Sequence, residues 1–322
     1  MTSSSIEPGA TEAAAAPIFK RLALLGIGLI GSSVARAARK HGLAGEIVGH
    51  SRRQETRDEA MALGFLDRIE ADPAAAVAGA DIVMICAPMG AYEQLARAIA
   101  PALAPGAVVT DVGSVKGMVA KTIAPYLPAG VHLVPGHPIA GTEHSGPSAG
   151  FAELFIDRWC VLTPEPGVDP QAVAKVEALW RGMGMMVEKM TAEHHDRVLA
   201  ITSHIPHLIA YTIVGTASDM EEATQAEVIR FSAGGFRDFT RIAGSDPVMW
   251  RDVFLTNKDA VLEVLQQFTE DLVRLQRAIR RGEGDTLQSW FTRTRAIRRG
   301  VVDAHQEEME PEKAARLTKE ED

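Results

Sequence analysis

The chain has 322 residues and a formal net charge of −9, and 46% of its residues are hydrophobic. This length suggests about two domains, and the composition suits a globular protein. The negative charge gives no support to a nucleic-acid or anionic-membrane partner. No apolar stretch reaches the roughly 20 residues that span a bilayer, and the N-terminus does not resemble a signal peptide. We therefore expect a cytoplasmic protein whose two cysteines, Cys86 and Cys160, are buried and reduced.

Short β-branched segments alternate with longer helical segments from Phe19 onward. Because the apolar runs are short and continuous, this pattern predicts a parallel sheet covered by helices on both faces. The segments expected to be strands of this one sheet are 21–28, 45–51, 80–88, 107–113, 132–138, 159–164 and 185–190. The helices expected between them are 32–42, 56–64, 91–103, 115–127 and 170–184.

After residue 191 the strand pattern ends, and long amphipathic helices are expected over 191–218, 257–282 and 285–308. The predicted fold class is α/β, with a doubly wound parallel-sheet (Rossmann) N-terminal domain followed by an all-helical C-terminal dimerisation domain. A homodimer is expected because helical domains with much apolar surface are often buried against a second copy. The expected boundaries are 1–17 for a disordered tail, 18–191 and 192–304 for the two domains, and 305–322 for an acidic disordered tail.

Gly26, Gly28 and Gly31 have the G-x-G-x-x-G spacing between the first strand and the first helix. Gly26 permits the tight turn, Gly28 lets the backbone approach a pyrophosphate, and Gly31 lets the helix lie close to the strand. The alternative is a glycine-rich turn that binds nothing. The residues expected to contact a dinucleotide are Gly26, Ile27, Gly28, Leu29, Ile30, Gly31, Ser51, Arg52, Arg53, Ala87 and Pro88.

The end of the second strand bears on which nicotinamide cofactor binds. An NAD site usually has an acid there for the ribose hydroxyls, whereas this chain has Ser51, Arg52 and Arg53 and no acid until Glu55. The serine and an arginine can hold a 2′-phosphate, which favours NADP. Arg52 can equally stack on adenine, which would make NADP and NAD both acceptable.

The segment LVPGHPIAGTEHSGP, residues 133–147, follows no helix or strand period, and its glycines and prolines indicate irregular backbone. The segment DVGSVK places Ser114 and Lys116 at the end of another strand, where doubly wound sheets bind ligands. We therefore expect residues 133–147 to form an active-site loop. On the first C-terminal helix, Ser203 and His207 of SHIPH share a face with Asp196, and a proline within SHIPH is expected to kink the helix.

The segments GIGLIGSS, DVGSVK, GHPIAGTEHSG, SHIPH and TRIAGSDPVMW occur in this order. Together they resemble the prephenate/arogenate (cyclohexadienyl) dehydrogenase family of tyrosine biosynthesis, and the similarity covers roughly residues 19 to 300. The resemblance implies NAD(P)-dependent oxidative decarboxylation of prephenate, arogenate or both. In that reaction hydride leaves the carbinol carbon of a cyclohexadienol, the hydroxyl loses its proton, and the ring expels CO₂ and becomes aromatic. No residue plainly selects one of the two substrates.

The resemblance also implies roles for the candidate site residues. His137 would accept the hydrogen bond of the substrate hydroxyl, Ser114 would bind the same hydroxyl, and Arg241 would hold a substrate carboxylate. The other substrate-binding candidates are His207 and Ser203 near the substrate side chain, Glu143 as a gate of the pocket, and Trp250, expected to enter from the partner subunit.

Structural interpretations stay open for the other histidines. His194 and His195 are as readily capping or packing residues as site residues. No metal is expected, because His204 and His207 lack further ligands nearby in the sequence. The histidines expected to be structural are His41, His50, His132 and His305, and His144 is expected to face solvent.

Two broader alternatives apply to the whole chain. One is another two-domain dehydrogenase of the β-hydroxyacid type, which generally uses a lysine of the helical domain as the acid or base. The other is a dinucleotide-sensing module that has lost catalysis. Lys116 in turn either contacts a ligand or only pairs with Asp111.

Overall fold

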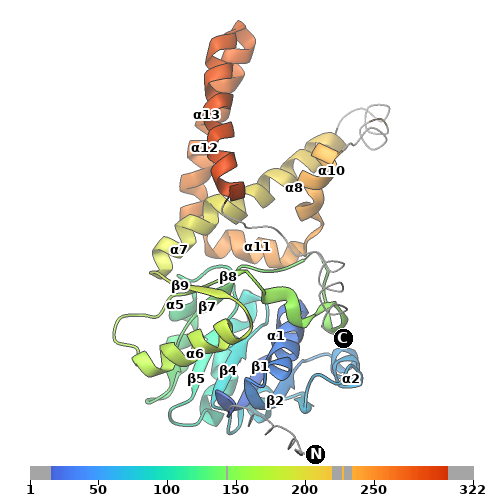
Figure 1. Ribbon diagram of the computed structural model, residues 1–322, viewed down its shortest axis with the longest axis vertical. Coiled ribbons are helices and arrows are strands. Elements are labelled where there is room, and N and C mark those ends of the chain that lie inside the picture. Colours follow the sequence, from blue (N-terminus) through green and yellow to red (C-terminus); the bar gives the residue numbers. More distant parts are fainter. Residues whose placement is uncertain (1–15, 143, 220–226, 228–233, 304–322) are drawn as a thin grey trace, which may run out of the picture.

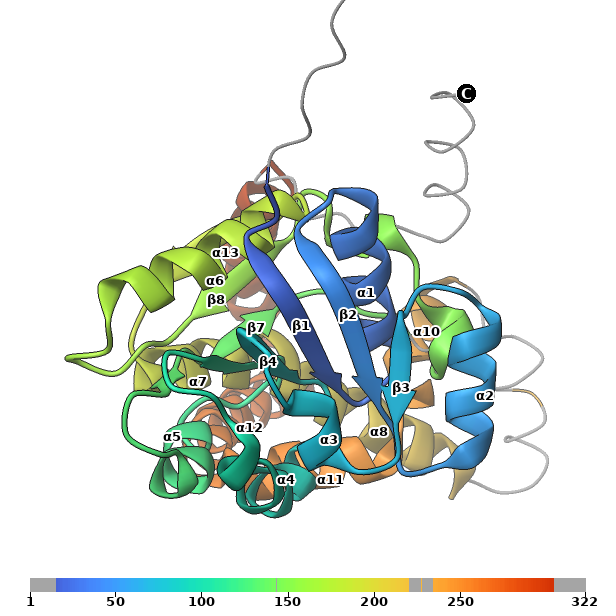
Figure 2. The ribbon, with the colours of Figure 1, turned by 90° about the horizontal axis from the view of Figure 1, so that it is seen from below.

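The computed structural model describes residues 16–142, 144–219, 227 and 234–303. Its N-terminal part contains a six-stranded parallel sheet in the order β3-β2-β1-β4-β5-β6 (Figures 1 and 2). The strand order reverses between β1 and β4, as in the doubly wound sheet that the sequence predicts. The strands are β1 (Phe19–Leu25), β2 (Ala44–His50), β3 (Arg68–Glu70), β4 (Ile82–Ile85), β5 (Val108–Asp111) and β6 (His132–Leu133).

Helices cover both faces of this sheet, because successive residues of a strand point to opposite sides. Leu22 and Leu24 of β1 pack with α1 and α6, whereas Ala23 and Leu25 pack with α3, α4 and α5. Burial on both faces explains the continuous apolar runs of the central strands. The helices are α1 (Leu29–Lys40), α2 (Gln54–Ala62), α3 (Pro73–Val77), α4 (Tyr92–Ile99), α5 (Val119–Ile123) and α6 (Pro170–Gly182).

The expectation of one continuous sheet through residue 190 is wrong. The predicted strand 132–138 is divided at Pro135, so that β6 ends the large sheet and β7 (Gly136–Pro138) begins a second one. This second sheet has the order β7-β8-β9, with β8 (Trp159–Leu162) antiparallel to β7 and parallel to β9 (Met186–Lys189). Proline has no amide to donate to a neighbouring strand, which gives a physical reason for the break.

The C-terminal part is helical throughout its described residues. Helices α12 and α13 form a hairpin that projects away from the sheets (Figure 1). Gly282 joins them with a left-handed φ of 67°, which suits glycine at the end of a helix. The elements are α7 (Ala192–Leu199), the π-helical turn η6 (Ala200–His204), α8 (Ile205–Ser218), α10 (Gly234–Thr240), the 3₁₀ turn η7 (Arg241–Gly244), α11 (Pro247–Thr256), α12 (Lys258–Arg281) and α13 (Gly284–Asp303).

The helical segment Ala192–Ser218 corrects the statement that no stretch is long and apolar enough to span a membrane. It has 27 residues and a mean hydropathy of 1.4 over its most apolar window, and 28% of that window is buried. Such a helix also occurs in the cores and interfaces of water-soluble proteins. Here the segment contains His195 and Asp196, which are buried and hydrogen-bonded within the chain.

Of the two tails expected to be disordered, only residues 16 and 17 are described, and His305 lies outside the described residues. Cys160 is buried and Cys86 is partly buried, and both are free thiols. Burial raises the pKa of each thiol, with the negative charge of Asp111 as a further cause.

Candidate active site

The turn between β1 and α1 has the geometry that the glycine spacing predicts. Gly26 has a φ of 111°, and a Cβ there would lie 2.8 Å from backbone atoms of Cys86 and Ala87. A Cβ on Gly31 would lie 2.1 Å from the Gly26 carbonyl oxygen. At Gly28, by contrast, nothing lies within 4 Å of a Cβ position, and no side chain caps the N-terminus of α1. The turn is thus closely packed at Gly26 and Gly31 and open at Gly28, an arrangement that leaves room for a dinucleotide phosphate.

The end of β2 leads into the residues expected to choose the cofactor. His50 ends the strand, is 4% exposed and contacts the carbonyl oxygen of Glu70 through its Nδ1 atom at 3.1 Å, so it is a structural residue as expected. Arg57 donates to the carbonyl oxygens of Ser51 and Arg52 at 2.7 and 2.9 Å, which fixes the backbone of the following turn. Ser51 is half-buried, while Arg52 and Arg53 are exposed.

A buried ion pair holds the strand that carries His137. The Lys116 Nζ atom lies 2.5 Å from the Asp111 Oδ2 atom, and both side chains are fully buried. Lys116 also donates to the Gly136 carbonyl oxygen at 2.6 Å, and the Gly136 amide donates to Asp111 at 3.2 Å. Of the two interpretations of Lys116, pairing with Asp111 is therefore the one observed. The pair joins the ends of β5 and β7 and fixes the backbone beside His137.

His137 contacts a second histidine, which in turn contacts a carboxylate. The Nδ1 atom of His137 lies 2.8 Å from the Nε2 atom of His195, and the Nδ1 atom of His195 lies 2.8 Å from the Oδ1 atom of Asp196. Asp196 also accepts hydrogen bonds from the backbone amides of Lys116 and Gly117, each at 2.7 Å. These contacts connect the loop after β5, strand β7 and helix α7 at one point.

The hydrogen-bond pattern assigns the protons of both imidazoles. An ionised carboxylate only accepts, so the His195 Nδ1 atom carries a hydrogen and its Nε2 atom has a lone pair. That lone pair accepts the hydrogen of the His137 Nδ1 atom. The acceptor nitrogen of His137 is consequently Nε2, as a hydrogen-bond acceptor for a hydroxyl requires.

Burial keeps these histidines neutral near pH 7. The pKa of His137 lies well below its ordinary value, first because of burial and then because of the nearby His195 and Lys116. The pKa of His195 is also lowered by burial, although its hydrogen bond to Asp196 acts in the opposite direction. Burial lowers the pKa of His204 to about 4. A neutral imidazole is the form that accepts a proton.

A π-helical turn sets the positions of the SHIPH side chains. The five residues Ala200–His204 form this turn directly before Pro206, which cannot donate to the preceding helical turn. A π-helical turn is wider than an α-helical one, so it changes the phase between Asp196 before the turn and His207 after it. The Asp196 carboxylate points to the loop after β5, while the His207 Nδ1 atom donates to the Ser203 carbonyl oxygen at 2.8 Å.

Trp250 is 6% exposed and stacks on His207 of its own chain, with ring centroids 3.7 Å apart. It packs among the residues of the sheet domain that include Met89 and Tyr92. Its own subunit thus buries this side chain, which differs from the expectation that it enters from the partner subunit. Helix α11, which carries Trp250, lies beside the sheets in Figure 1.

The structure brings Ser114 close to the histidines but leaves Arg241 at the surface. Ser114 is half-buried in the loop whose next amides bind Asp196, and its carbonyl group acts on the pKa of His204. Arg241 is exposed at the start of η7. Tyr211 of α8 donates to the carbonyl oxygen of Ser245, the residue that follows η7, at 2.8 Å. Glu143 lies outside the described residues, and His144 is exposed as expected.

Three polar residues of this site were not assigned to it from the sequence: His195, whose role was left open, His204 and Asn257. His195 is fully buried between His137 and Asp196, and His204 is fully buried and accepts at Nδ1 from the Asn257 side chain at 3.1 Å. Asn257 also donates to the Asp196 carbonyl oxygen at 2.9 Å. A histidine next to an aspartate in AEHHDR was the available signal for the first, whereas Asn257 carries none. Among the described residues, no group of three His, Cys, Asp or Glu side chains is arranged to hold a metal ion.

Two family models match the chain: the prephenate dehydrogenase nucleotide-binding domain over residues 34–189, and the prephenate dehydrogenase dimerization domain over residues 191–293. The chain is 42% identical over 288 residues to a cyclohexadienyl dehydrogenase of Zymomonas mobilis, with 89% of this chain and 98% of that protein covered. It is 33% identical over 282 residues to a prephenate dehydrogenase of Bacillus subtilis, with 86% and 75% covered.

Solved structures agree with these relatives. Prephenate dehydrogenase of Aquifex aeolicus, in complex with hydroxyphenyl propionate and NAD⁺, has a TM-score of 0.82 at 32% identity and covers 88% of this chain and 98% of its own. Arogenate dehydrogenase of Synechocystis has a TM-score of 0.74 at 26% identity, with 87% and 99% covered. With both family models matched along most of its length, the chain belongs to the prephenate dehydrogenase family.

Proposed function

We propose that the protein catalyses the NAD(P)-dependent oxidative decarboxylation of prephenate, arogenate or both, in the formation of 4-hydroxyphenylpyruvate or tyrosine. The observation that carries this proposal is the proton assignment of His137, whose acceptor nitrogen is fixed by the contact to His195. The relatives named cyclohexadienyl, prephenate and arogenate dehydrogenases support the substrate class.

The bound nicotinamide would accept the hydride, and the side chains of this chain supply the remaining chemistry. His137 accepts the hydroxyl proton at Nε2, and Ser114 binds the same hydroxyl from the adjacent loop. The open face of Gly28 and the first turn of α1 hold the pyrophosphate. His137 and His195 are buried, which keeps water away from the proton-accepting groups and strengthens their hydrogen bonds.

The substrate-binding part of the proposal assigns a carboxylate to Arg241 and the substrate side chain to His207 and Ser203. Glu143 gates the pocket. Arg241 lies at the surface, and its planar guanidinium can bind a carboxylate through two hydrogen bonds. Arg241→Ala is expected to raise the KM for prephenate far more than it lowers kcat. An unchanged KM would remove Arg241 from the site.

NADP is the proposed preferred cofactor. Arg52 and Arg53 are exposed beside Ser51, and neither forms an ion pair with a described carboxylate, so their charges are accessible to a 2′-phosphate. Steady-state kinetics with both cofactors test this preference. A kcat/KM for NAD⁺ equal to or above that for NADP⁺ would contradict it, and Arg52→Ala should weaken NADP⁺ binding selectively.

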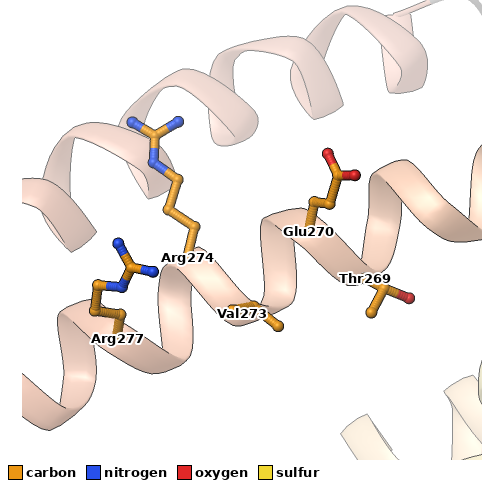
Figure 3. A pocket seen from close by; sticks show the side chains of 5 residues that line it. All are labelled: Thr269, Glu270, Val273, Arg274 and Arg277. Atoms are coloured by element: carbon orange, nitrogen blue, oxygen red, sulfur yellow. The ribbon is translucent and has the colours of Figure 1, made fainter.

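We also assign the second domain, residues 192–304 after a first domain at 18–191, to a homodimer. Large apolar side chains remain exposed along the hairpin, including Leu262, Ile279 and Ile297 at 60%, 67% and 64%. A pocket on α12, lined by Thr269, Glu270, Val273, Arg274 and Arg277, lies within the same exposed hairpin (Figure 3). Burial of this surface against a second copy explains its composition. A cytoplasmic location accompanies the proposal, since both cysteines are free.

The experiment that tests the function is direct. The purified protein is incubated with prephenate or arogenate and with NADP⁺ or NAD⁺, and the absorbance of the reduced nicotinamide is recorded together with CO₂ release. Turnover of at least one substrate, with equal amounts of CO₂ and reduced cofactor, is expected. Absence of turnover in all four combinations would refute the proposal.

A further inference from the structure

The strongest candidate for a new role is the pair His195 and Asp196, to which the proposed function assigns no part in proton transfer. His195 is 0% exposed, and its two ring nitrogens contact His137 and Asp196 at 2.8 Å each. Asp196 is held from the opposite side by the amides of Lys116 and Gly117. A buried charged side chain with three donors has a fixed position, so the orientation of His195 is fixed as well.

We propose that His195 and Asp196 are positioning residues that form a buried proton relay with His137, which receives the substrate hydroxyl proton and later returns it to the product oxygen. This inference rests on the proposed function. It adds to that function the path of the proton within the protein.

The relay follows from the order of donors and acceptors. As the substrate oxygen gives its proton to the His137 Nε2 atom, the hydrogen on the His137 Nδ1 atom can pass to the His195 Nε2 atom. His137 is then neutral again, and the positive charge lies on His195, directly beside the Asp196 carboxylate. Burial disfavours a cation on His137, whereas on His195 the cation has a carboxylate partner. The nearby cation of Lys116 opposes this charge, but it is paired with Asp111.

The balance of the reaction explains why such a relay needs no route to solvent. The hydroxyl oxygen loses its proton while hydride leaves the same carbon, which forms the dienone. Loss of CO₂ leaves its electron pair in the ring, and aromatisation places the negative charge on the former hydroxyl oxygen. That oxygen takes one proton to become the phenol, so the overall reaction neither releases nor consumes a proton. A buried relay can therefore accept the hydroxyl proton and later return a proton to the same oxygen, without exchange with solvent.

Two variants of His195 separate proton transfer from the orientation of His137. In His195→Gln the side-chain amide reaches the position of the Nε2 atom, so its oxygen can still accept from His137. In His195→Asn the amide reaches only the position of the Nδ1 atom, so the contact to Asp196 is kept and His137 loses its acceptor. The amide oxygen of glutamine accepts the hydrogen bond of His137 but cannot take up a proton. We therefore expect kcat to fall at least about 100-fold in both variants, with the substrate KM changed less than about threefold in both and the His137 hydrogen kept on Nδ1 in His195→Gln.

His194→Asn is the matched control, because His194 is the exposed neighbour on the same helix and should retain wild-type kcat. A role of His195 that is limited to orienting His137 predicts a kcat within about tenfold of wild type in His195→Gln, and that result would overturn the relay. Thermal unfolding and cofactor binding are measured for each variant, so that a folding defect is recognised.

A second readout needs no turnover. Nitrogen-15 NMR of the histidine-labelled wild-type protein, without substrate, distinguishes a protonated ring nitrogen from a lone-pair nitrogen, and His137→Asn identifies the signals. We expect the hydrogen of His137 on Nδ1, and a hydrogen on Nε2 would refute the relay. Wild-type protein that turns over neither substrate would refute the proposed function instead, whereas wild-type turnover together with a near-wild-type kcat in His195→Gln would refute the relay alone.

Discussion

Replacement of His137 by asparagine tests the central chemical claim with little disturbance of the structure. The asparagine amide reaches about as far as the imidazole Nδ1 atom, so it can donate to the His195 Nε2 atom in place of the 2.8 Å contact. The lone pair at Nε2, however, is lost. The backbone of β7 should not move, because Asp111 and Lys116 hold Gly136 independently of the His137 side chain.

The expected magnitude follows from the role of a positioned proton acceptor, which contributes about 10²- to 10⁴-fold to a rate. This corresponds to about 3–5 kcal/mol in the activation free energy. The dinucleotide turn at Gly26–Gly31 lies between β1 and α1 and does not include His137, so the Kd of the cofactor should change less than about twofold.

The assay combines steady-state kcat from the absorbance of the reduced nicotinamide with cofactor Kd from calorimetry, on the wild-type protein and on His137→Asn. Loss of turnover with unchanged cofactor binding is expected. If turnover and cofactor binding fall together, His137 acts in folding; if kcat stays within about threefold of wild type, it is not the proton acceptor.

Three further predictions concern stability and binding. Gly28→Ala should leave the melting temperature unchanged and weaken cofactor binding. Gly31→Ala should lower the melting temperature, because its Cβ would lie 2.1 Å from a backbone oxygen. Equal changes of melting temperature in the two variants would contradict this difference between the two glycines. Asp111→Asn leaves Lys116 charged and buried, so urea unfolding should show a loss of about 3–5 kcal/mol, part of which the added Lys116→Met change restores; no loss would mean that the pair is not buried. Folding lowers the pKa of His204 from 6.5 to about 4, so the unfolded chain binds more protons than the folded chain between these two pH values. The contribution of His204 to the free energy of unfolding should therefore fall by about 3 kcal/mol as the pH decreases from 6.5 to about 4. His204→Asn should reduce the pH dependence of stability in this range, and an equally steep curve would contradict the assignment.

Much of the fold and part of the site could be predicted from local patterns. The G-x-G-x-x-G spacing located a turn whose glycines are required at Gly26 and Gly31 by contacts with backbone atoms. Local patterns did not predict the break at Pro135, where the chain leaves one sheet and enters another. Periodicity indicates that a segment is a strand but not which strand it pairs with. Strand β3 and helix α3 are too short for periodicity to indicate them.

By itself, the sequence determined the alternation of strands and helices, the glycine-rich turn after the first strand and the choice of His137 as the candidate proton acceptor, because each depends on residues close together in the chain. Only the tertiary structure decided which nitrogen of His137 can accept a proton. That property depends on His195, which is 58 residues away, and on a carboxylate held by amides of a third segment. Hydrogen bonds between distant segments leave no spacing in the sequence, so their direction becomes visible only when the chain is folded.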